Sequence, residues 1–220
     1  MTIRAALFDI DGTLVDSNYL HVEAWSRAFA EIGQPVDAWR IHRSIGMDGE
    51  KLLDDLQPEA NSETRERVTA LHSDHYGSLA SRLRPFAGGP ELLRELTSRG
   101  VVVVLATSAP QKELEALRST LQVEDAVDVV TSAEDVDTAK PAPDIVQVAL
   151  KRAQTAADES VMIGDSVWDV KAAGKAGVQC IGLLSGGISR AELLAAGAIA
   201  VYSGTAELLD RLDDSPLVAR

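Results

Sequence analysis

The chain has 220 residues, of which 45% are hydrophobic and 25% are charged, and its formal net charge is −13. This length suits one domain, or one domain that carries a smaller insert. The negative charge disfavours nucleic acids and anionic membranes as partners, because both are bound through basic surfaces. A small phosphate monoester stays possible, since one lysine and a metal ion are enough to hold it.

The cysteine count and the apolar runs indicate where the protein is found. A single cysteine, Cys180, excludes an internal disulfide framework, and its apolar surroundings favour a place in the core. No run is long enough to span a membrane. The first residues, "MTIRAALFD", contain no basic segment followed by a long apolar one. We therefore expect a cytoplasmic protein without a signal peptide.

Apolar runs along the chain predict strands that alternate with helices. β-Branched residues fill "VVVVLAT", as expected for a strand that is buried on both faces. Between the runs, leucine, valine and alanine recur at helical spacing. This alternation predicts an α/β fold with a doubly wound parallel sheet. The expected strands are Ile3–Asp9, Val101–Thr107, Ala126–Ser132, Ser160–Asp165, Val178–Leu184 and Ala198–Gly204.

Residues 17–84 interrupt the alternation, because they contain helical patterns and no convincing strand. One pattern begins at Val22 and stops at Gly33, and a second begins at Val68. The segment "RPFAGGPE", with its proline and glycine residues, is typical of a return linker. We expect a core domain of residues 1–16 and 85–220 and a helical insert of residues 17–84.

The first strand is followed by a cluster of acidic residues in "AALFDIDGTLVDS", namely Asp9, Asp11 and Asp16. In a strand, residues two apart point to the same side, so Asp9 and Asp11 are expected to face one way. Gly12 permits a tight turn after them. Two carboxylates this close repel each other, and a divalent cation such as Mg²⁺ relieves that repulsion.

Polar side chains also follow three later elements of the predicted sheet. Thr107 and Ser108 follow the second strand, and Lys140 precedes two prolines. The run "MIGDSVWD" supplies Asp165 and Asp169. Because the carboxyl ends of parallel strands lie at one edge of the sheet, we expect these groups to meet Asp9 there.

These motifs resemble the four signature motifs of the haloacid dehalogenase-like hydrolase superfamily. The motifs are Asp9 to Thr13, then Thr107, then Lys140, then Gly164 to Asp169. The helical insert resembles the cap of the subgroup that contains phosphoglycolate phosphatase and β-phosphoglucomutase. The resemblance implies a Mg²⁺-dependent phosphatase acting on a small phosphorylated metabolite, either a sugar phosphate or phosphoglycolate.

The resemblance also implies a role for each motif residue. Asp9 would attack phosphorus and form an aspartyl phosphate. Asp11 would protonate the leaving alkoxide and later deprotonate the attacking water. Mg²⁺ would be held by the side chain of Asp9, the backbone carbonyl of Asp11 and Asp165, with Asp169 in support. The phosphate would be bound by Thr107, Ser108 and Lys140.

The insert is expected to choose the substrate. His21 resembles a cap residue that faces the substrate, and Arg43 lies in a loop that resembles the cap loop of the subgroup and could bind a second anionic group. Asp16 is expected to cap the first insert helix or to shape the hinge. Trp25 and Trp168 are expected to be packing residues, and His72 and His75 to be surface or packing residues of a helix.

Several other functions stay open at this point. A β-phosphoglucomutase is the nearest alternative, although His72 stands near the place of a cap lysine in that family. Phosphonoacetaldehyde hydrolysis would need a cap lysine, and Lys51 does not match its position. A haloacid dehalogenase would not need Asp11. A non-catalytic binding protein would be expected to have lost one of these residues. We expect either a monomer or a homodimer.

Overall fold

The computed structural model describes residues 3–136 and 140–218. The outermost parts of the expected core domain, residues 1–2 and 219–220, lie outside the described residues, as do residues 137–139.

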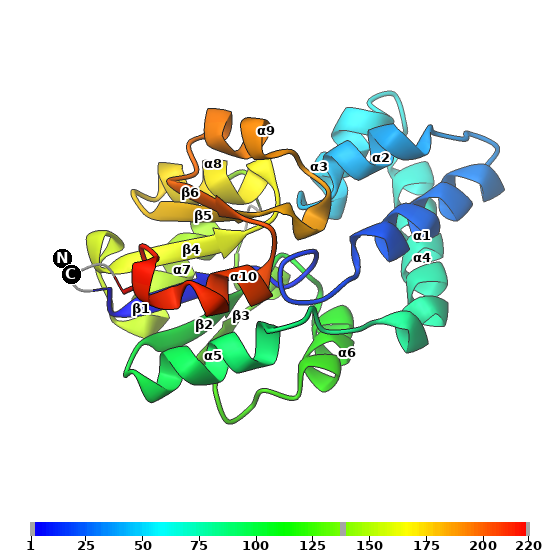
Figure 1. The fold of residues 1–220 in the computed structure, drawn as a ribbon. Helices are drawn as coiled ribbons and strands as arrows, with labels where there is room; N and C mark the ends of the chain where they lie inside the picture. The colour runs from blue at the N-terminus through cyan, green and yellow to red at the C-terminus, as the bar shows by residue number, and fades with distance from the viewer. Residues whose placement is uncertain (1–2, 137–139, 219–220) are drawn as a thin grey trace.

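A six-stranded parallel sheet forms the centre of the protein (Figure 1), which confirms the predicted fold class. The strand order is β3-β2-β1-β4-β5-β6, so β1 pairs with β2 on one side and with β4 on the other. The strands are shorter than predicted, because pairing stops where the chain turns away from its neighbours. They are β1 (Ala5–Phe8), β2 (Val102–Ala106), β3 (Val129–Thr131), β4 (Ser160–Gly164), β5 (Gln179–Leu183) and β6 (Ala200–Tyr202).

Alternate residues of each strand enter two hydrophobic clusters on opposite faces of the sheet. In β1, Ala6 and Phe8 join one cluster, whereas Ala5 and Leu7 join the other. Helices cover both faces, which is why the strands are continuously apolar. The covering helices are α5 (Gly89–Ser98), α6 (Gln111–Leu121), α7 (Asp144–Ala153), α8 (Val167–Lys175), α9 (Arg190–Ala196) and α10 (Thr205–Asp210).

Four helices between β1 and α5 lie beyond the carboxyl ends of the strands rather than on either face of the sheet (Figure 1). They share a hydrophobic cluster of their own, which includes Trp25, Phe29 and Leu53, all fully or almost fully buried. The helices are α1 (Asn18–Glu31), α2 (Ala38–Ser44), α3 (Gly49–Leu56) and α4 (Ser62–Leu79). We refer to them as the cap; its expected limits, residues 17–84, stay a prediction.

Two backbone segments join the cap to the core, and they run side by side. The Asp16 N–H donates to the Arg84 carbonyl at 2.9 Å, and the Phe86 N–H donates to the Leu14 carbonyl at 2.8 Å. Ser17, rather than Asp16, occupies the N-cap position of α1, and Asp16 is exposed. Of the two expected roles of Asp16, capping of this helix is therefore wrong, because the helix begins one residue later than it requires; a role in the hinge stays a prediction.

No helix within residues 3–136 and 140–218 is both long and apolar enough to cross a membrane.

Candidate active site

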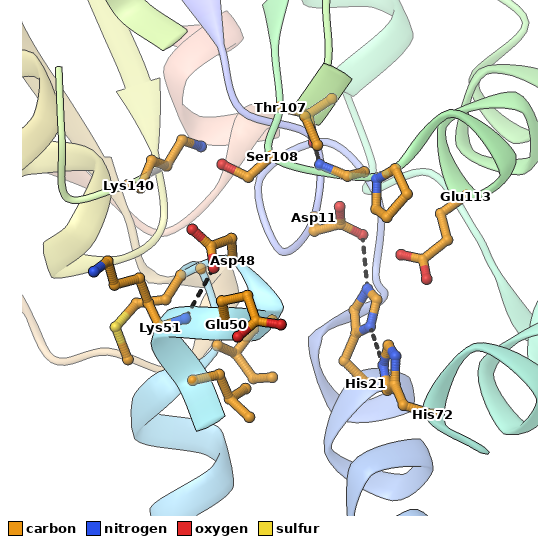
Figure 2. Close-up of a pocket in the computed structure, with 18 of the residues that line it drawn as sticks. Asp11, His21, Asp48, Glu50, Lys51, His72, Thr107, Ser108, Glu113 and Lys140 are labelled. Atoms are coloured by element: carbon orange, nitrogen blue, oxygen red, sulfur yellow. Dashed lines mark hydrogen bonds and ion pairs between the residues drawn. The ribbon is translucent and has the colours of Figure 1, made fainter. Parts of the chain in front are cut away.

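A cavity of about 650 Å³ lies between the cap and the carboxyl ends of β1 and β2. Figure 2 shows residues from both sides of this cavity, with Thr107, Ser108 and Lys140 on the core side and His21, Asp48 and His72 on the cap side. Because carboxyl ends of parallel strands gather at one edge, residues far apart in sequence meet here.

Lys140 is buried against two carboxylates at the floor of the cavity. Its ammonium group lies 2.5 Å from Asp9 Oδ1 and 2.7 Å from Asp169 Oδ1. Burial opposes the charge of Lys140, but Asp169 and Asp9 outweigh it and raise the pKa of Lys140. Burial raises the pKa of Asp9 well above its usual value, and Lys140 opposes that rise. Lys140 therefore favours the ionised form of Asp9.

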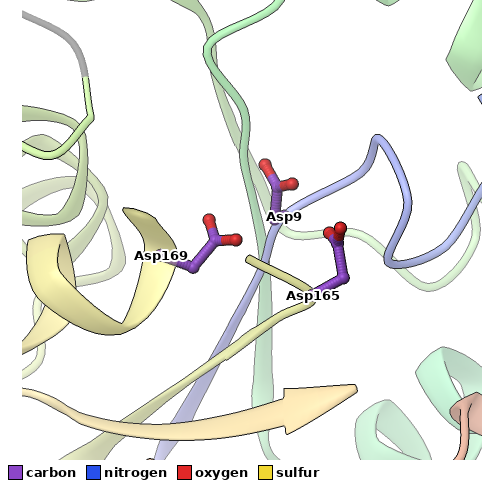
Figure 3. A group of neighbouring side chains, drawn as sticks. All are labelled: Asp9, Asp165 and Asp169. Atoms are coloured by element: carbon purple, nitrogen blue, oxygen red, sulfur yellow. The ribbon is translucent and has the colours of Figure 1, made fainter. Parts of the chain in front are cut away.

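Three aspartates come together beside this lysine (Figure 3). Asp9 follows β1, Asp165 follows β4, and Asp169 lies in the first turn of α8; one carboxylate oxygen from each lies within 4.8 Å of the others. Asp165 accepts hydrogen bonds from Thr13 Oγ1 at 2.7 Å and from Asn18 Nδ2 at 2.8 Å. Burial and then Asp169 nevertheless raise the pKa of Asp165 to about 7.

The donor set of this cluster fits a divalent cation. One ammonium group faces three buried carboxylates, so negative charge is in excess, and hard oxygen ligands suit Mg²⁺. Asp165 accepts one hydrogen bond at each oxygen and Asp9 contacts Lys140 through Oδ1, so both keep lone pairs for a cation; Asp169 is the most engaged of the three. Asp169 Oδ1 contacts Lys140, and Asp169 Oδ2 accepts from the backbone N–H and the hydroxyl of Ser166, which caps α8.

Two glycines shape the space around Asp165. A Cβ atom on Gly186 would lie 1.8 Å from Asp165 Oδ2, and one on Gly12 would lie 2.5 Å from the same oxygen. Gly12 also has a φ of +75°, which side chains rarely adopt. Both positions therefore require glycine for the carboxylate to keep its place.

Asp11 lines the same cavity in a different environment. β1 ends at Phe8, so the turn after it, rather than strand alternation, directs Asp9 and Asp11 into the cavity. Asp11 Oδ1 accepts a hydrogen bond from Ser17 Oγ at 2.6 Å and lies 3.3 Å from His21 Nε2. Burial alone would raise the pKa of Asp11, but His21 and Ser17 outweigh it and lower the pKa. The two neighbouring aspartates thus have pKa values shifted in opposite directions.

A second histidine stands behind His21, which the sequence did not reveal. His21 Nδ1 lies 3.1 Å from His72 Nε2 (Figure 2). His72 also stacks on Trp25. Burial, followed by the charges of His21 and His75, lowers the pKa of His72 to about 2. His72 is therefore neutral and can accept from His21, whose own pKa is raised by Asp11 against the effect of burial. His72 is a packing residue that also lines the cavity, not a surface residue.

Hydroxyl groups from the loop after β2 line the cavity on the core side, near Asp11 (Figure 2). Thr107 is buried, and its Oγ1 accepts from the Ala109 N–H at 3.0 Å. Ser108 Oγ is buried and has no hydrogen-bond partner among the described residues. A buried hydroxyl without a partner beside Lys140 suits an anion such as a phosphate.

Arg43 is not among the described residues that line the cavity. Its guanidinium pairs with Glu192 on α9, and its backbone carbonyl accepts from Trp168 Nε1 at 3.3 Å. In the structure Arg43 and Trp168 therefore connect α2 of the cap with the core. Binding of a substrate anion by Arg43 stays a prediction to which the structure adds no contact.

Glu113 is a second cavity residue that the sequence did not single out. It lies in the first turn of α6, and its carboxylate is turned toward the side of the cavity that holds Asp11 and His21 (Figure 2). Burial raises the pKa of Glu113. No motif marks this residue, because only the packing of α6 beside β2 brings it to the cavity.

Comparisons with known proteins point in one direction. A family model described as haloacid dehalogenase-like hydrolase matches residues 6–183. A phosphorylated carbohydrates phosphatase from Thermotoga maritima is 30% identical over 205 residues, covering 90% of this chain and 94% of that protein. A phosphoglycolate phosphatase from Rhodospirillum rubrum is 30% identical over 223 residues, covering 95% of this chain and 90% of that one. The crystal structure of a hydrolase from Pseudomonas syringae is similar with a TM-score of 0.92 at 35% identity, covering 97% of this chain and 99% of that one.

Proposed function

The chain belongs to the haloacid dehalogenase-like hydrolase family, and from that premise we propose that it is a Mg²⁺-dependent phosphatase of a small phosphate monoester. The substrate is of the sugar phosphate or phosphoglycolate type, as the names of the relatives suggest. The observation that carries the proposal is geometric: Asp9 contacts Lys140 and lies in one cluster with Asp165, and Asp9, Asp11, Thr107 and Lys140 line the same cavity.

Asp9 is the nucleophile in this proposal. Its carboxylate attacks phosphorus and forms an aspartyl phosphate, while the bond from phosphorus to the ester oxygen breaks. Lys140 keeps Asp9 ionised and holds it in place through the contact at 2.5 Å. Thr107 and Ser108, which lie on the same core side of the cavity, hold the phosphate oxygens, so that the phosphate is fixed for in-line attack.

Asp11 is the general acid and then the general base. His21 donates to Asp11 and has a raised pKa, so the pair holds a proton that can pass to the leaving alkoxide. Asp11 then takes a proton from the water that attacks the aspartyl phosphate, which releases inorganic phosphate and restores Asp9.

Mg²⁺ would be held by Asp9, Asp165 and the backbone carbonyl of Asp11. When bound it neutralises negative charge on the phosphoryl oxygens. Asp169 does not act as a ligand in this proposal, because it orients Lys140 and accepts from Ser166, the N-cap residue of α8.

Phosphatase chemistry is favoured over a β-phosphoglucomutase by the charges of the cavity. A mutase must grip a second phosphate with cationic residues of the cap. Among the described cap residues that line the cavity, Lys51 is the only lysine or arginine, and its ammonium group lies 3.9 Å from Asp54.

The test is release of inorganic phosphate from a panel of phosphate monoesters in the presence of Mg²⁺. Asp9→Asn should abolish release, because an amide is a far poorer nucleophile, whereas Asp16→Asn, an exposed site in the same segment, should leave it unchanged. A chelator should stop release and added Mg²⁺ should restore it. Full turnover by Asp9→Asn would refute the mechanism.

A further inference from the structure

The end of the cavity that would receive the alcohol part of the substrate is acidic. Beyond the catalytic aspartates, the described lining residues include the carboxylates of Asp48, Glu50 and Glu113. The lysines among them are Lys140, which is engaged by Asp9 and Asp169, and Lys51; no described lining residue is an arginine.

Three of these groups are already engaged in contacts of the cap. The Glu50 carboxylate lies 3.5 Å from the guanidinium of Arg65. The Asp48 carboxylate accepts from the Lys51 backbone N–H at 2.9 Å and so caps α3. The Lys51 side chain is half exposed, and Figure 2 shows its ammonium group directed away from Glu113. Lys51 therefore does not neutralise the wall that contains Glu113.

Glu113 remains as a partly buried carboxylate without a partner. No described residue donates a hydrogen bond to it, and the groups that act on it most strongly besides burial are His21 and Asp11. His21 donates to Asp11, so its positive charge is already shared. A carboxylate in this position costs free energy unless a ligand brings a hydrogen-bond donor or a positive charge to it.

We propose that Glu113 makes this enzyme selective for phosphate monoesters whose alcohol carries a protonated amine close to the ester oxygen, and selective against esters that carry a carboxylate there. The proposal rests on the proposed phosphatase function, and it sets phosphoglycolate apart as a poor substrate, although the name of one relative suggests it.

The position of Glu113 relative to Asp11 explains the selectivity. Asp11 acts on the ester oxygen, so the first carbon atoms of the alcohol lie next to it, on the side where Glu113 faces the cavity. An ammonium group on these carbons would contact carboxylate rather than water. A carboxylate there would meet Asp11 and Glu113 together, and like charges in a partly buried site repel strongly. The hydroxyls of Thr69 and Ser73 add polar contacts for a hydroxyl-rich remainder.

Three esters of two-carbon alcohols, which carry groups of different charge at the second carbon, provide the test. They are O-phosphoethanolamine with an ammonium group, 2-hydroxyethyl phosphate with a neutral hydroxyl, and phosphoglycolate with a carboxylate. We expect kcat/KM to fall in that order, with about a tenfold difference or more between the first and the last.

Glu113→Gln keeps the size of the side chain and removes its charge. We expect it to reduce the ratio of kcat/KM between O-phosphoethanolamine and phosphoglycolate by about tenfold, with the neutral ester changing least. Glu115→Gln is the matched control, since Glu115 lies on the same helix but is exposed. The ratio compares substrates within one preparation, so partial loss of folded enzyme cancels.

The outcomes separate this inference from the proposed function. The role of Glu113 would be overturned if phosphate were released but the kcat/KM values of the three esters did not follow the expected order. It would also be overturned if Glu113→Gln left that order and its ratios unchanged. Both outcomes would leave the proposed phosphatase function intact. If phosphate were released from none of the three esters and from no other monoester, the proposed phosphatase function would be refuted, and the selectivity with it.

Discussion

Replacing Lys140 by methionine removes the ammonium group that lies between Asp9 and Asp169 but keeps most of the side-chain volume. The side chain of Lys140 is 1% exposed, and those of Asp9 and Asp169 are 6% and 0% exposed. Water therefore cannot replace the lost charge. Breaking a buried ion pair by removing one partner costs about 3–5 kcal/mol, so we expect the free energy of unfolding to fall by about that amount near pH 8.

The loss should depend on pH in a definite direction. Burial already raises the pKa of Asp9 above its value in the unfolded chain, and without Lys140 the pKa rises further. A carboxylate whose pKa is raised by folding destabilises the protein at a pH above the unfolded value and ceases to do so once the pH falls below it. The penalty of Lys140→Met should therefore shrink between pH 8 and pH 4.

Urea unfolding in the presence of a chelator measures this penalty, with Lys175→Met as the control because Lys175 is an exposed lysine near Pro141. The double variant Lys140→Met with Asp169→Asn should recover part of the stability, since it removes one of the two unpaired carboxylates. It should not recover phosphate release, because Asp9 still lacks its cation. A loss below about 1 kcal/mol, or an equal loss at both ends of the pH range, would refute the reasoning.

Two further predictions concern residues that support the site. Folding lowers the pKa of His72 to about 2 from a usual value of 6.5, so the unfolded chain takes up a proton that the folded one does not, and stability falls as the pH drops below 6.5. His72→Gln keeps an acceptor for His21 but has no group that takes up this proton. The fall in the free energy of unfolding between pH 8 and pH 5, measured by urea unfolding, should therefore be about 2 kcal/mol smaller in the variant than in the unmodified protein. An unchanged acid sensitivity would contradict this. Thr13→Val removes the hydroxyl that donates to Asp165 and should raise the Mg²⁺ concentration for half-maximal phosphate release by about tenfold, while Thr120→Val, outside the cavity, should not.

Much of the fold could be predicted from local patterns. Continuous apolar runs mark strands that are covered on both faces, and the alternation of strand and helix restricts the sheet to parallel pairing. Strand ends were less well predicted, as for β3, because pairing with a neighbour decides where a strand stops. The start of α1 was missed by one residue for a similar reason, since the antiparallel contact of Asp16 with Arg84 holds Asp16 outside the helix.

The meeting of Asp9, Lys140 and Asp165 also followed from the sequence. In a parallel sheet the carboxyl end of every strand lies at the same edge, so polar residues after successive strands are brought together whatever their separation along the chain. Lys140 and Asp9 are 131 residues apart, yet their side chains are in contact. Gly12 and Thr13 belong to the same motif as Asp9, and both support Asp165. Gly12 leaves space for the Asp165 carboxylate, and the Thr13 hydroxyl donates a hydrogen bond to it.

Only the tertiary structure decided which side chains the cap presents to the cavity. His72 reaches His21 because α4 packs against α1, Glu113 enters because of how α6 lies beside the sheet, and Arg43 is drawn to Glu192 instead of the substrate space. Apolar periodicity determines that a helix forms and which stripe it buries, since that depends on neighbours three and four residues away. Which polar residue at the border of that stripe faces the cavity depends on the angle between packed helices, and that angle is set by contacts between distant parts of the chain.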